Sequence, residues 1–208
     1  MQKLREEIIQ TALKLFDAQG FHRVSVNQIV KEAGTSKGGF YHHFQSKDEL
    51  LFVIHDTFIT YVLKEAEAAT ETHQSPVEQI QEIIRSFVHV FDLYQSHITV
   101  FYQESNYVDE TFEDEINRKR DQFKDKVIAV VKRGQEEGEF RHELPPEITG
   151  MAILGMVNWL NKWYRREGSH TIEEIAEVFT DLVLHFLLPG HGGVSGVEQR
   201  PPFFYGKK

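Results

Sequence analysis

The chain has 208 residues, a formal net charge of -9 at pH 7 and no cysteine. This length suits one or two compact domains with a sizeable core, and the lack of cysteine excludes disulfides and thiolate metal ligands. The first residues are charged, and no run approaches the roughly 18 apolar residues that a membrane span needs. We therefore expect a cytoplasmic protein that has no membrane partner.

The charge is distributed unevenly along the chain. Residues 1–50 carry seven Lys/Arg and six Asp/Glu, whereas the remaining residues carry 16 basic and 26 acidic side chains. We call residues 1–50 the head and the rest of the chain the body. A near-neutral head on an acidic body suits a protein that presents one end to nucleic acid. Because many proteins show a modest asymmetry of this kind, the charge pattern alone is weak evidence.

Apolar residues recur at helical spacing along the chain, and no convincing strand alternation is present. We therefore predict an all-α fold of about nine helices. The first helix covers residues 3–19 and ends at Gly20, and Ser25 caps a second, short helix. Thr35 or Ser36 caps a third helix that runs to about residue 44. The later helices are predicted over residues 47–69, 76–94, 98–104, 109–137, 146–165 and 171–188.

The second and third helices are joined at Ala33-Gly34-Thr35, which is the spacing of a helix-turn-helix unit. Such a unit places its second helix in the major groove of DNA, with the N-terminal residues toward base edges. Two glycines there remove Cβ atoms, so the backbone can approach the bases, and hydroxyl, imidazole and ammonium groups suit phosphate. The residues predicted to contact DNA are Ser25, Val26, Thr35, Ser36, Lys37, Gly38, Gly39, Tyr41, His42 and Lys47.

This stretch also admits two other interpretations. Residues 35–44 also fit an ordinary helical hairpin inside a bundle. His42 and His43 also suggest a metal pair, but adjacent residues on a helix project about 100° apart and share one ion poorly. We therefore predict no metal site.

The head resembles the N-terminal domain of TetR-family transcriptional repressors. The resemblance is carried by Phe16, Gly20-Phe21, Ser25-Val26, Ile29, the continuous run of residues 33–44 and the run of residues 46–51. Gly39 departs from it, because the family often has a small β-branched or hydroxyl residue there. The resemblance implies a DNA-binding domain in residues 1–48 and a ligand-binding and dimerisation domain in residues 49–188. Glycine, proline and polar residues dominate residues 189–208, which predicts a flexible tail.

The family resemblance also implies a function. It implies a repressor that binds a palindromic double-stranded DNA operator as a homodimer and is released by a small apolar ligand, with no cofactor and no enzymatic activity. An activator, a sensor of drug-like molecules and a helical protein-interaction module are the alternatives. No Gly-rich phosphate loop or nucleophile motif favours an enzyme.

Apolar stripes on the last two helices predict a dimer interface, although part of each stripe must close the core of one subunit. A dimer needs such a face because a palindromic operator requires two heads about 34–36 Å apart or a multiple of that. The predicted interface residues are Ile153, Met156, Val157, Leu160, Ile175, Val178, Phe179, Leu182, Val183 and Phe186.

An aromatic cluster in the body predicts a cavity for the ligand, with packed core as the alternative. The candidate residues are Phe87, Phe91, Tyr94, Phe101, Tyr102, Gln103, Asn158, Trp159 and Trp163. The block of residues 155–164, with residues 172–177, is similar to TetR-family regulators of fatty-acid and steroid degradation, which implies an acyl-coenzyme A ligand. The basic residues suited to its phosphates are Arg118, Lys119, Arg120, Lys124, Lys162, Arg165 and Arg166.

Overall fold

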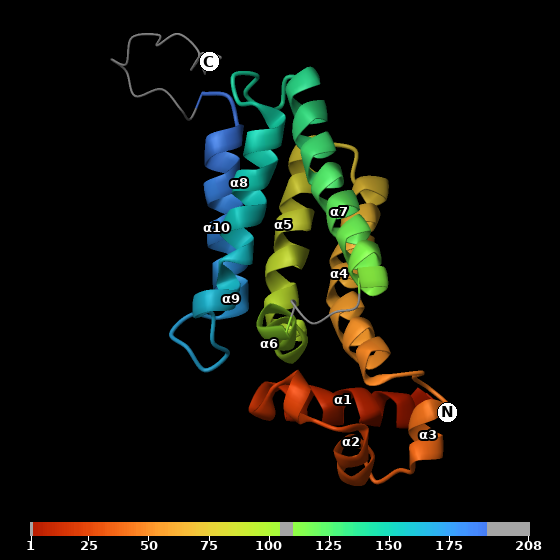
Figure 1. Cartoon of the computed structure of the whole chain (residues 1–208). Coiled ribbons are helices and arrows are strands. Elements are labelled where there is room, and N and C mark those ends of the chain that lie inside the picture. The colour runs from red at the N-terminus through yellow and green to blue at the C-terminus, as the bar shows by residue number, and fades with distance from the viewer. Residues whose placement is uncertain (1, 105–109, 191–208) are drawn as a thin grey trace, which may run out of the picture.

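The computed structural model describes residues 2–104 and 110–190, and it places no side chain for residues 2, 103, 104, 110 and 111. Most of the tail predicted over residues 189–208 lies outside the described residues. Within the described residues, all regular secondary structure is helical, which confirms the predicted all-α class (Figure 1).

A small head of short helices forms one end of the molecule (Figure 1). It contains α1 (Gln2–Gln19), a 3-10 turn (Phe21–Arg23), α2 (Val26–Glu32) and α3 (Lys37–Tyr41). The first helix ends as predicted at Gly20, whose positive φ of 79° is accessible to glycine at little cost. Serines cap the two short helices of the head. The hydroxyls of Ser25 and Ser36 each accept a backbone N–H, at the starts of α2 and α3 respectively.

Helix α3 is shorter than predicted, because it ends at Tyr41 instead of residue 44. Residues 42–43 form a turn that leads to Ser46, the cap of the next helix. Phe40 and Phe44 are both buried, so the chain turns where two phenylalanines enter the same core.

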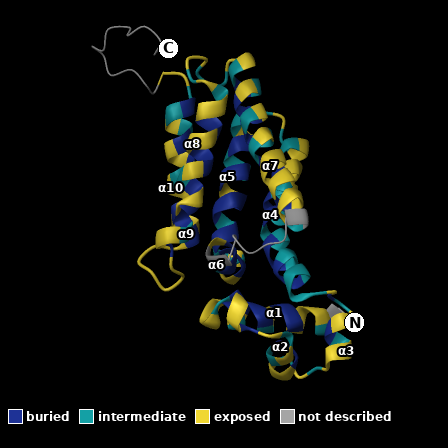
Figure 2. Ribbon diagram, in the orientation of Figure 1, coloured by how far each residue is buried: buried dark blue, intermediate teal, exposed yellow. Residues whose placement is uncertain are grey.

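The body consists of longer helices packed along one another (Figure 1). They are α4 (Lys47–Thr72), α5 (Pro76–Leu93), α6 (Gln95–Glu104), α7 (Glu110–Glu136), α8 (Pro146–Asn158), α9 (Leu160–Trp163) and α10 (Ile172–Leu187). The central helix α5 contacts α4 and α7 as well as α10, and it is buried along much of its length (Figure 2). The first half of α4 extends into the head, so this helix links the two parts.

The helix predicted over residues 146–165 is interrupted at Trp159 and ends at Trp163. Tyr164 has an extended backbone, with a ψ of 133°, and its hydroxyl donates to Asp92 on α5 at 2.7 Å. This contact ties the end of α9 to α5. The prediction of one continuous helix was therefore wrong, because a tertiary contact outweighs the helical tendency of the sequence.

The described residues contain two hydrophobic cores. One fills the body, and the other fills the head around Phe16, Phe40 and Phe44. The head core also takes Leu50, Leu51 and Ile54 from α4 and Val100 from α6. We therefore propose that the head is a packing unit that extends into α4, past the boundary expected at residue 48.

Candidate DNA-binding face and ligand cavity

The turn between α2 and α3 is held by backbone geometry. Gly34 has a positive φ of 65°, and the following Thr35 N–H donates to the Val30 carbonyl at 2.9 Å. The Ser36 hydroxyl then accepts the Gly39 N–H at 3.1 Å, so Ser36 is the cap of α3. A left-handed residue at the turn is what reverses the chain within so few residues.

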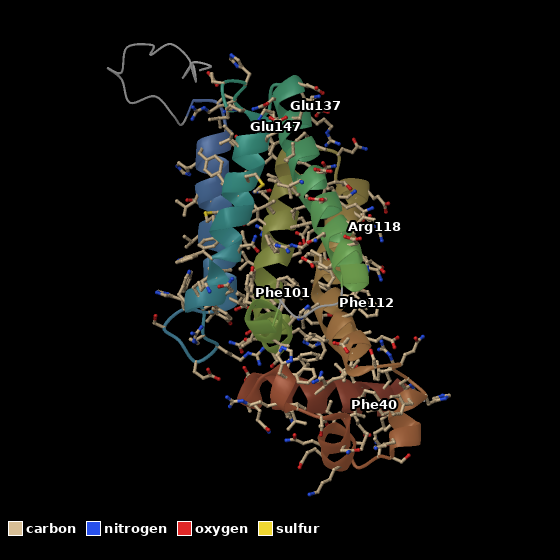
Figure 3. The ribbon with its side chains drawn as sticks, viewed as in Figure 1. Phe40, Phe101, Phe112, Arg118, Glu137 and Glu147 are labelled. Carbon is tan, nitrogen blue, oxygen red and sulfur yellow. The ribbon has the colours of Figure 1, made fainter. Side chains whose placement is uncertain are left out.

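The outer face of α3 carries the polar residues predicted to meet DNA. Ser36, Lys37, Gly38, Tyr41 and His42 are all exposed, whereas Phe40 points into the head (Figure 3). The structure thus brings these five predicted residues together on one accessible helix face. Of the remaining predicted residues, Ser25 is exposed at the start of α2, and Val26 and Thr35 are half-buried.

The two glycines of α3 have different surroundings. A Cβ added to Gly38 would meet only the Ser36 hydroxyl, at 3.7 Å. A Cβ added to Gly39 would lie 2.4 Å from the Thr35 hydroxyl and 3.6 Å from Leu4. Gly38 is therefore the position where α3 is open to an approaching surface. Gly39 also makes room for side chains of its own head, so its lack of a side chain has an internal reason as well.

Lys47 was predicted to contact phosphate, but its side chain is engaged within the head. Its ammonium donates to the backbone carbonyls of Phe21 and Val24, each at 2.9 Å. It also lies 4.0 Å from the centroid of the Phe21 ring, which is a cation–π distance. Lys47 therefore holds the turn before α2, where its ammonium bridges the carbonyls of Phe21 and Val24.

Arg5 is a residue beside the candidate face that the sequence reasoning missed. Its guanidinium lies 5.4 Å from the centroid of the Phe44 ring. Burial, followed by the charges of His42 and Arg5, lowers the pKa of His43. Helical periodicity places Arg5 on the solvent side of α1, but only the packing of α1 against α3 brings its charge to this edge.

The body contains a cavity of about 580 Å³ that is lined from α4, α5, α6, α7 and α8. This volume lies within the roughly 300–1,000 Å³ that small-molecule sites occupy. Four of the predicted ligand residues line it, namely Phe87, Phe101, Tyr102 and Asn158. Phe101 lies on α6, at the end of the body that faces α1 (Figure 3). The other lining residues are Phe58, Ile59, Val62, Ile116, Asn117, Arg120, Asp121, Phe123, Lys124, Met151, Leu154 and Gly155.

A second cavity of about 410 Å³ lies between α5, α6, α9 and the segment after α9. Phe91 and Tyr102 are the predicted ligand residues in its wall. Tyr102 lines both cavities, so the two spaces adjoin at this side chain. The remaining lining residues are Gln95, Ile98, Thr99, Leu160, Asn161, Lys162, Tyr164 and Arg165.

The basic residues considered for nucleotide phosphates do not form a single cluster. Arg120 and Lys124 line the larger cavity, and Lys162 and Arg165 line the smaller one. Two others already have carboxylate partners: Lys119 pairs with Asp56 on α4, and Arg166 pairs with Asp92 on α5. Arg118 lies on the outer side of α7 (Figure 3).

Several predicted ligand residues lie elsewhere. Trp159 and Trp163 are 63% and 43% exposed, so the prediction that they line the cavity was wrong. Trp159 lies between α8 and α9, and Trp163 is the last residue of α9. Tyr94 packs its ring against Tyr61, with 5.4 Å between the centroids. The side chain of Gln103 is not among the parts of the chain that the structure describes.

Half of the predicted dimer residues belong to the core of the single chain. Ile153, Val157, Leu160, Ile175 and Val183 are buried there, so their assignment to an interface between subunits was wrong. The reason is that α8 and α10 each bury one side against α5 or its neighbours.

The other half are exposed or half-buried on the outside of α8 and α10. Val178 is 56% exposed and Leu182 is 49% exposed, and Met156, Phe179 and Phe186 are half-buried. Ile148, Met151 and Trp159 add further exposed apolar area on the α8 side. We call these eight residues the α8–α10 patch (Figure 2 shows the exposed sides of both helices).

Comparison with known proteins agrees with this architecture. Residues 8–54 match the family of bacterial regulatory proteins of the tetR family, and residues 73–187 match the tetracyclin repressor-like C-terminal domain. The second match covers more than half of the chain. The protein therefore belongs to the TetR family of transcriptional regulators.

Individual relatives cover most of the chain. The transcriptional repressor KstR2 of Mycobacterium tuberculosis is 23% identical over 186 residues, which is 86% of this chain and 90% of KstR2. The structure of the regulator PfmR from Thermus thermophilus is 29% identical, with a TM-score of 0.79, and the match covers 85% of this chain and 96% of PfmR. AibR, solved with isovaleryl coenzyme A and operator DNA, shares the fold at 22% identity and a TM-score of 0.74, over 86% of this chain and 97% of AibR.

The family membership establishes the general class of function. The chain is a DNA-binding transcriptional regulator, and its family is one of regulators, not of enzymes. Among the helices that the structure describes, none is both long and apolar enough to cross a membrane.

Proposed function

We propose that the protein is a repressor that binds a palindromic operator as a homodimer and is released by a small apolar ligand. The observation that carries the proposal is the exposed face of α3, where Ser36, Lys37, Gly38 and Tyr41 lie together on a five-residue helix. Serine, lysine and tyrosine donate to phosphate or base edges, and the open position at Gly38 permits close approach of the backbone. Arg5 supplies a positive charge at the same edge.

The α8–α10 patch supports a dimer. Large exposed apolar side chains gathered on one face of a protein mark an interaction site. Two copies that meet through α8 and α10 bury this patch in a four-helix arrangement and hold two heads at a fixed separation. A palindromic operator requires that fixed separation, because its half-sites lie about 34–36 Å apart or a multiple of that.

The cavity in the body supports a ligand with a large apolar part, for which a fatty acyl-coenzyme A is the candidate. Phe58, Phe87 and Phe123 form apolar walls, and Asn158 supplies a polar group. AibR, which shares the fold, is described with isovaleryl coenzyme A and operator DNA. A ligand of this class in the present cavity would contact α4, α6 and α7 at once.

Helix α6 provides the path from the cavity to the head. Phe101 lines the cavity, whereas its neighbour Val100 is buried in the head core. A ligand that repositions Phe101 therefore moves a helix that contacts both α1 of the head and α4. By linkage, the ligand weakens operator binding by the same factor as the operator weakens ligand binding.

The test is a gel mobility shift with the DNA upstream of the protein's own gene. We expect a complex that runs as a dimer on DNA and that dissociates when dodecanoyl-coenzyme A is added. Substitution Lys37→Met should weaken the complex, because it removes a cation from the face of α3. If the protein does not retard this DNA more strongly than a scrambled DNA, the expected operator is absent from this region. If the complex persists at saturating ligand, dodecanoyl-coenzyme A is not the effector.

A further inference from the structure

Trp159 is a large aromatic residue that lies outside both cores. It stands at the junction of α8 and α9, at the end of the body that faces the head (Figure 1). Its side chain is 63% exposed. Tryptophan is strongly enriched among the residues that anchor protein–protein interfaces, where it fills pockets of the partner and loses its water. An exposed tryptophan inside the α8–α10 patch is therefore a candidate anchor, and its pocket remains to be found.

A hollow of about 230 Å³ lies between α9 and the first turns of α10. It opens on the outside of the molecule, because Trp163 and Val178 in its wall are 43% and 56% exposed. Four apolar and two exposed polar residues line it, which are Trp163, Ile175, Val178, Phe179, His170 and Glu174. We call this space the α9–α10 hollow. It overlaps the α8–α10 patch, since Val178 and Phe179 belong to both.

Glu174 adds a hydrogen-bond acceptor to the apolar wall of the hollow. Its Oε2 accepts the Thr171 N–H at 3.0 Å and lies 3.6 Å from Nδ1 of His170. A carboxylate has about four lone-pair sites, so it can accept a further donor. The chemistry of the hollow thus matches a flat apolar group that carries one N–H donor. An indole is such a group, because its ring is apolar and its N–H only donates.

Operator binding sets which parts of two subunits can meet. Both heads of a dimer face the same DNA, so its two-fold axis runs along the body, away from the heads. Residues at one height in a subunit then meet residues at the same height in the partner. Trp159 and the α9–α10 hollow share one height, because α9 and the start of α10 both lie at the head-facing end (Figure 1). Ile148, in the first turn of α8, lies at the opposite end.

We propose that Trp159 of each subunit fills the α9–α10 hollow of a second copy of this chain. The indole ring packs on Val178 of the partner subunit, and its N–H donates to the partner subunit's Glu174. In an isologous interface every contact occurs twice, so the dimer has two such anchors. This inference rests on the proposed function, because it specifies a contact of the dimer proposed there.

The test mixes two variants of the full-length protein that carry one cysteine each, Trp159→Cys and Val178→Cys. The natural chain has no cysteine, so a short bismaleimide joins the introduced thiols. In the mixed dimer one hollow faces both cysteines, while the other still receives an unaltered Trp159, so one anchor is kept. We expect the mixture to form more covalent dimer than either variant alone. The matched control mixes Ile148→Cys with Val178→Cys and should link poorly, because Ile148 lies at the other end of α8.

Trp159→Ala tests whether the anchor contributes to the affinity of the dimer. Sedimentation equilibrium should show a dissociation constant at least about tenfold higher than in wild type, with unchanged circular dichroism. Trp159→Phe keeps an aromatic ring but has no N–H donor, so its loss should be smaller, about threefold. Leu93→Ala is the control, since it removes a large side chain that is 58% exposed on α5, outside the α8–α10 patch. It should change the dissociation constant by less than about twofold.

The failure of the anchor differs from the failure of the proposed dimer. If wild type is dimeric but the 159–178 mixture links no better than the 148–178 mixture, the anchor is wrong and the dimer stands. A Trp159→Ala variant that dimerises as wild type does has the same meaning. If wild type sediments as a monomer, both the anchor and the proposed dimer are wrong, while operator binding is measured separately by the gel shift.

Discussion

Val100 and Phe101 are consecutive residues of α6 that belong to two different parts of the molecule. Val100 is fully buried in the core of the head, and Phe101 lines the larger cavity of the body. Phe101 also contacts His55 and Phe58 of α4 edge-on, with 4.8 Å and 5.0 Å between the ring centroids. One helical turn of α6 thus joins the cavity, the long helix α4 and the head.

Val100→Ala tests whether α6 stabilises the head. Removing buried methyl groups leaves a cavity, and we expect the free energy of unfolding to fall by about 1–3 kcal/mol. The loss should be concentrated in the head, so hydrogen exchange should accelerate in α1 and α2 more than in α5. Leu93→Ala, at an exposed position near the end of α5 that lies outside the α8–α10 patch, is the control. Uniform acceleration in both parts would show that Val100 has no special relation to the head.

Gly38→Ala and Gly39→Ala should separate DNA approach from internal packing. Alanine at position 38 meets open space, so stability should stay the same or rise by about 0.5–1 kcal/mol, while operator affinity falls if DNA approaches there. Alanine at position 39 forces the Thr35 side chain to rotate, so stability should fall instead. The measurements are thermal unfolding and operator titration. Unchanged operator affinity in folded Gly38→Ala would place the close approach elsewhere.

Lys47→Met should affect the stability of the protein, whereas Lys37→Met should affect its binding to DNA. Loss of Lys47 removes the ammonium from the Val24 carbonyl and leaves the Phe21 carbonyl with the Val24 N–H alone, so we expect a stability loss of about 1–3 kcal/mol. Loss of exposed Lys37 should leave stability unchanged and reduce the salt dependence of operator binding by about one unit. Denaturant unfolding and operator affinity across a salt series measure the two effects. If folded Lys47→Met also shows a reduced salt dependence of operator binding, Lys47 contacts DNA phosphate as its sequence position predicts.

The stability of the protein should fall in mild acid because of His55. Burial, with a smaller contribution from His97, lowers the pKa of His55 to about 4, and the Val100 backbone offsets only part of this. Since the unfolded chain has the ordinary histidine pKa of about 6.5, it binds a proton more readily than the folded chain between the two values. The contribution of His55 to the free energy of unfolding is therefore present above about pH 6.5 and is lost as the pH falls toward 4.

His55→Leu tests this pH dependence. The difference in unfolding free energy between pH 7 and pH 4.5 should shrink by about 2–3 kcal/mol, since the leucine takes up no proton. His142→Gln, at an exposed position near the start of α8, should leave the difference as it is in wild type. Denaturant unfolding at the two pH values gives both numbers. An unchanged difference in His55→Leu would mean that other groups cause the acid sensitivity.

Leu182→Asp tests the α8–α10 patch as the dimer interface. A carboxylate in a buried apolar interface is costly, so sedimentation should show monomers and operator affinity should drop by at least about tenfold. Ala68→Asp, at an exposed position of α4, is the control and should leave both unchanged. A dimeric Leu182→Asp with wild-type affinity would exclude this face.

The head could be predicted well because its signals are local. Serine caps, Gly20 and Gly34 at chain reversals, and Phe40 and Phe44 four residues apart each act within a few residues of the chain. Such signals are complete in the sequence, so the order of the short helices and the exposed face of α3 followed from it. The interior role of Lys47 did not, because its carbonyl partners lie more than 20 residues away.

The body was predicted in outline only. The sequence by itself determined that its helices are amphipathic and rich in aromatic residues, and it therefore predicted a large apolar interior. Only the tertiary structure decided which residues face that interior: Val157 and Ile175 went to the core, and Trp159 and Trp163 went outside. The physical reason is that helical periodicity gives each helix an apolar side, whereas burial depends on how the neighbouring helices are placed around it.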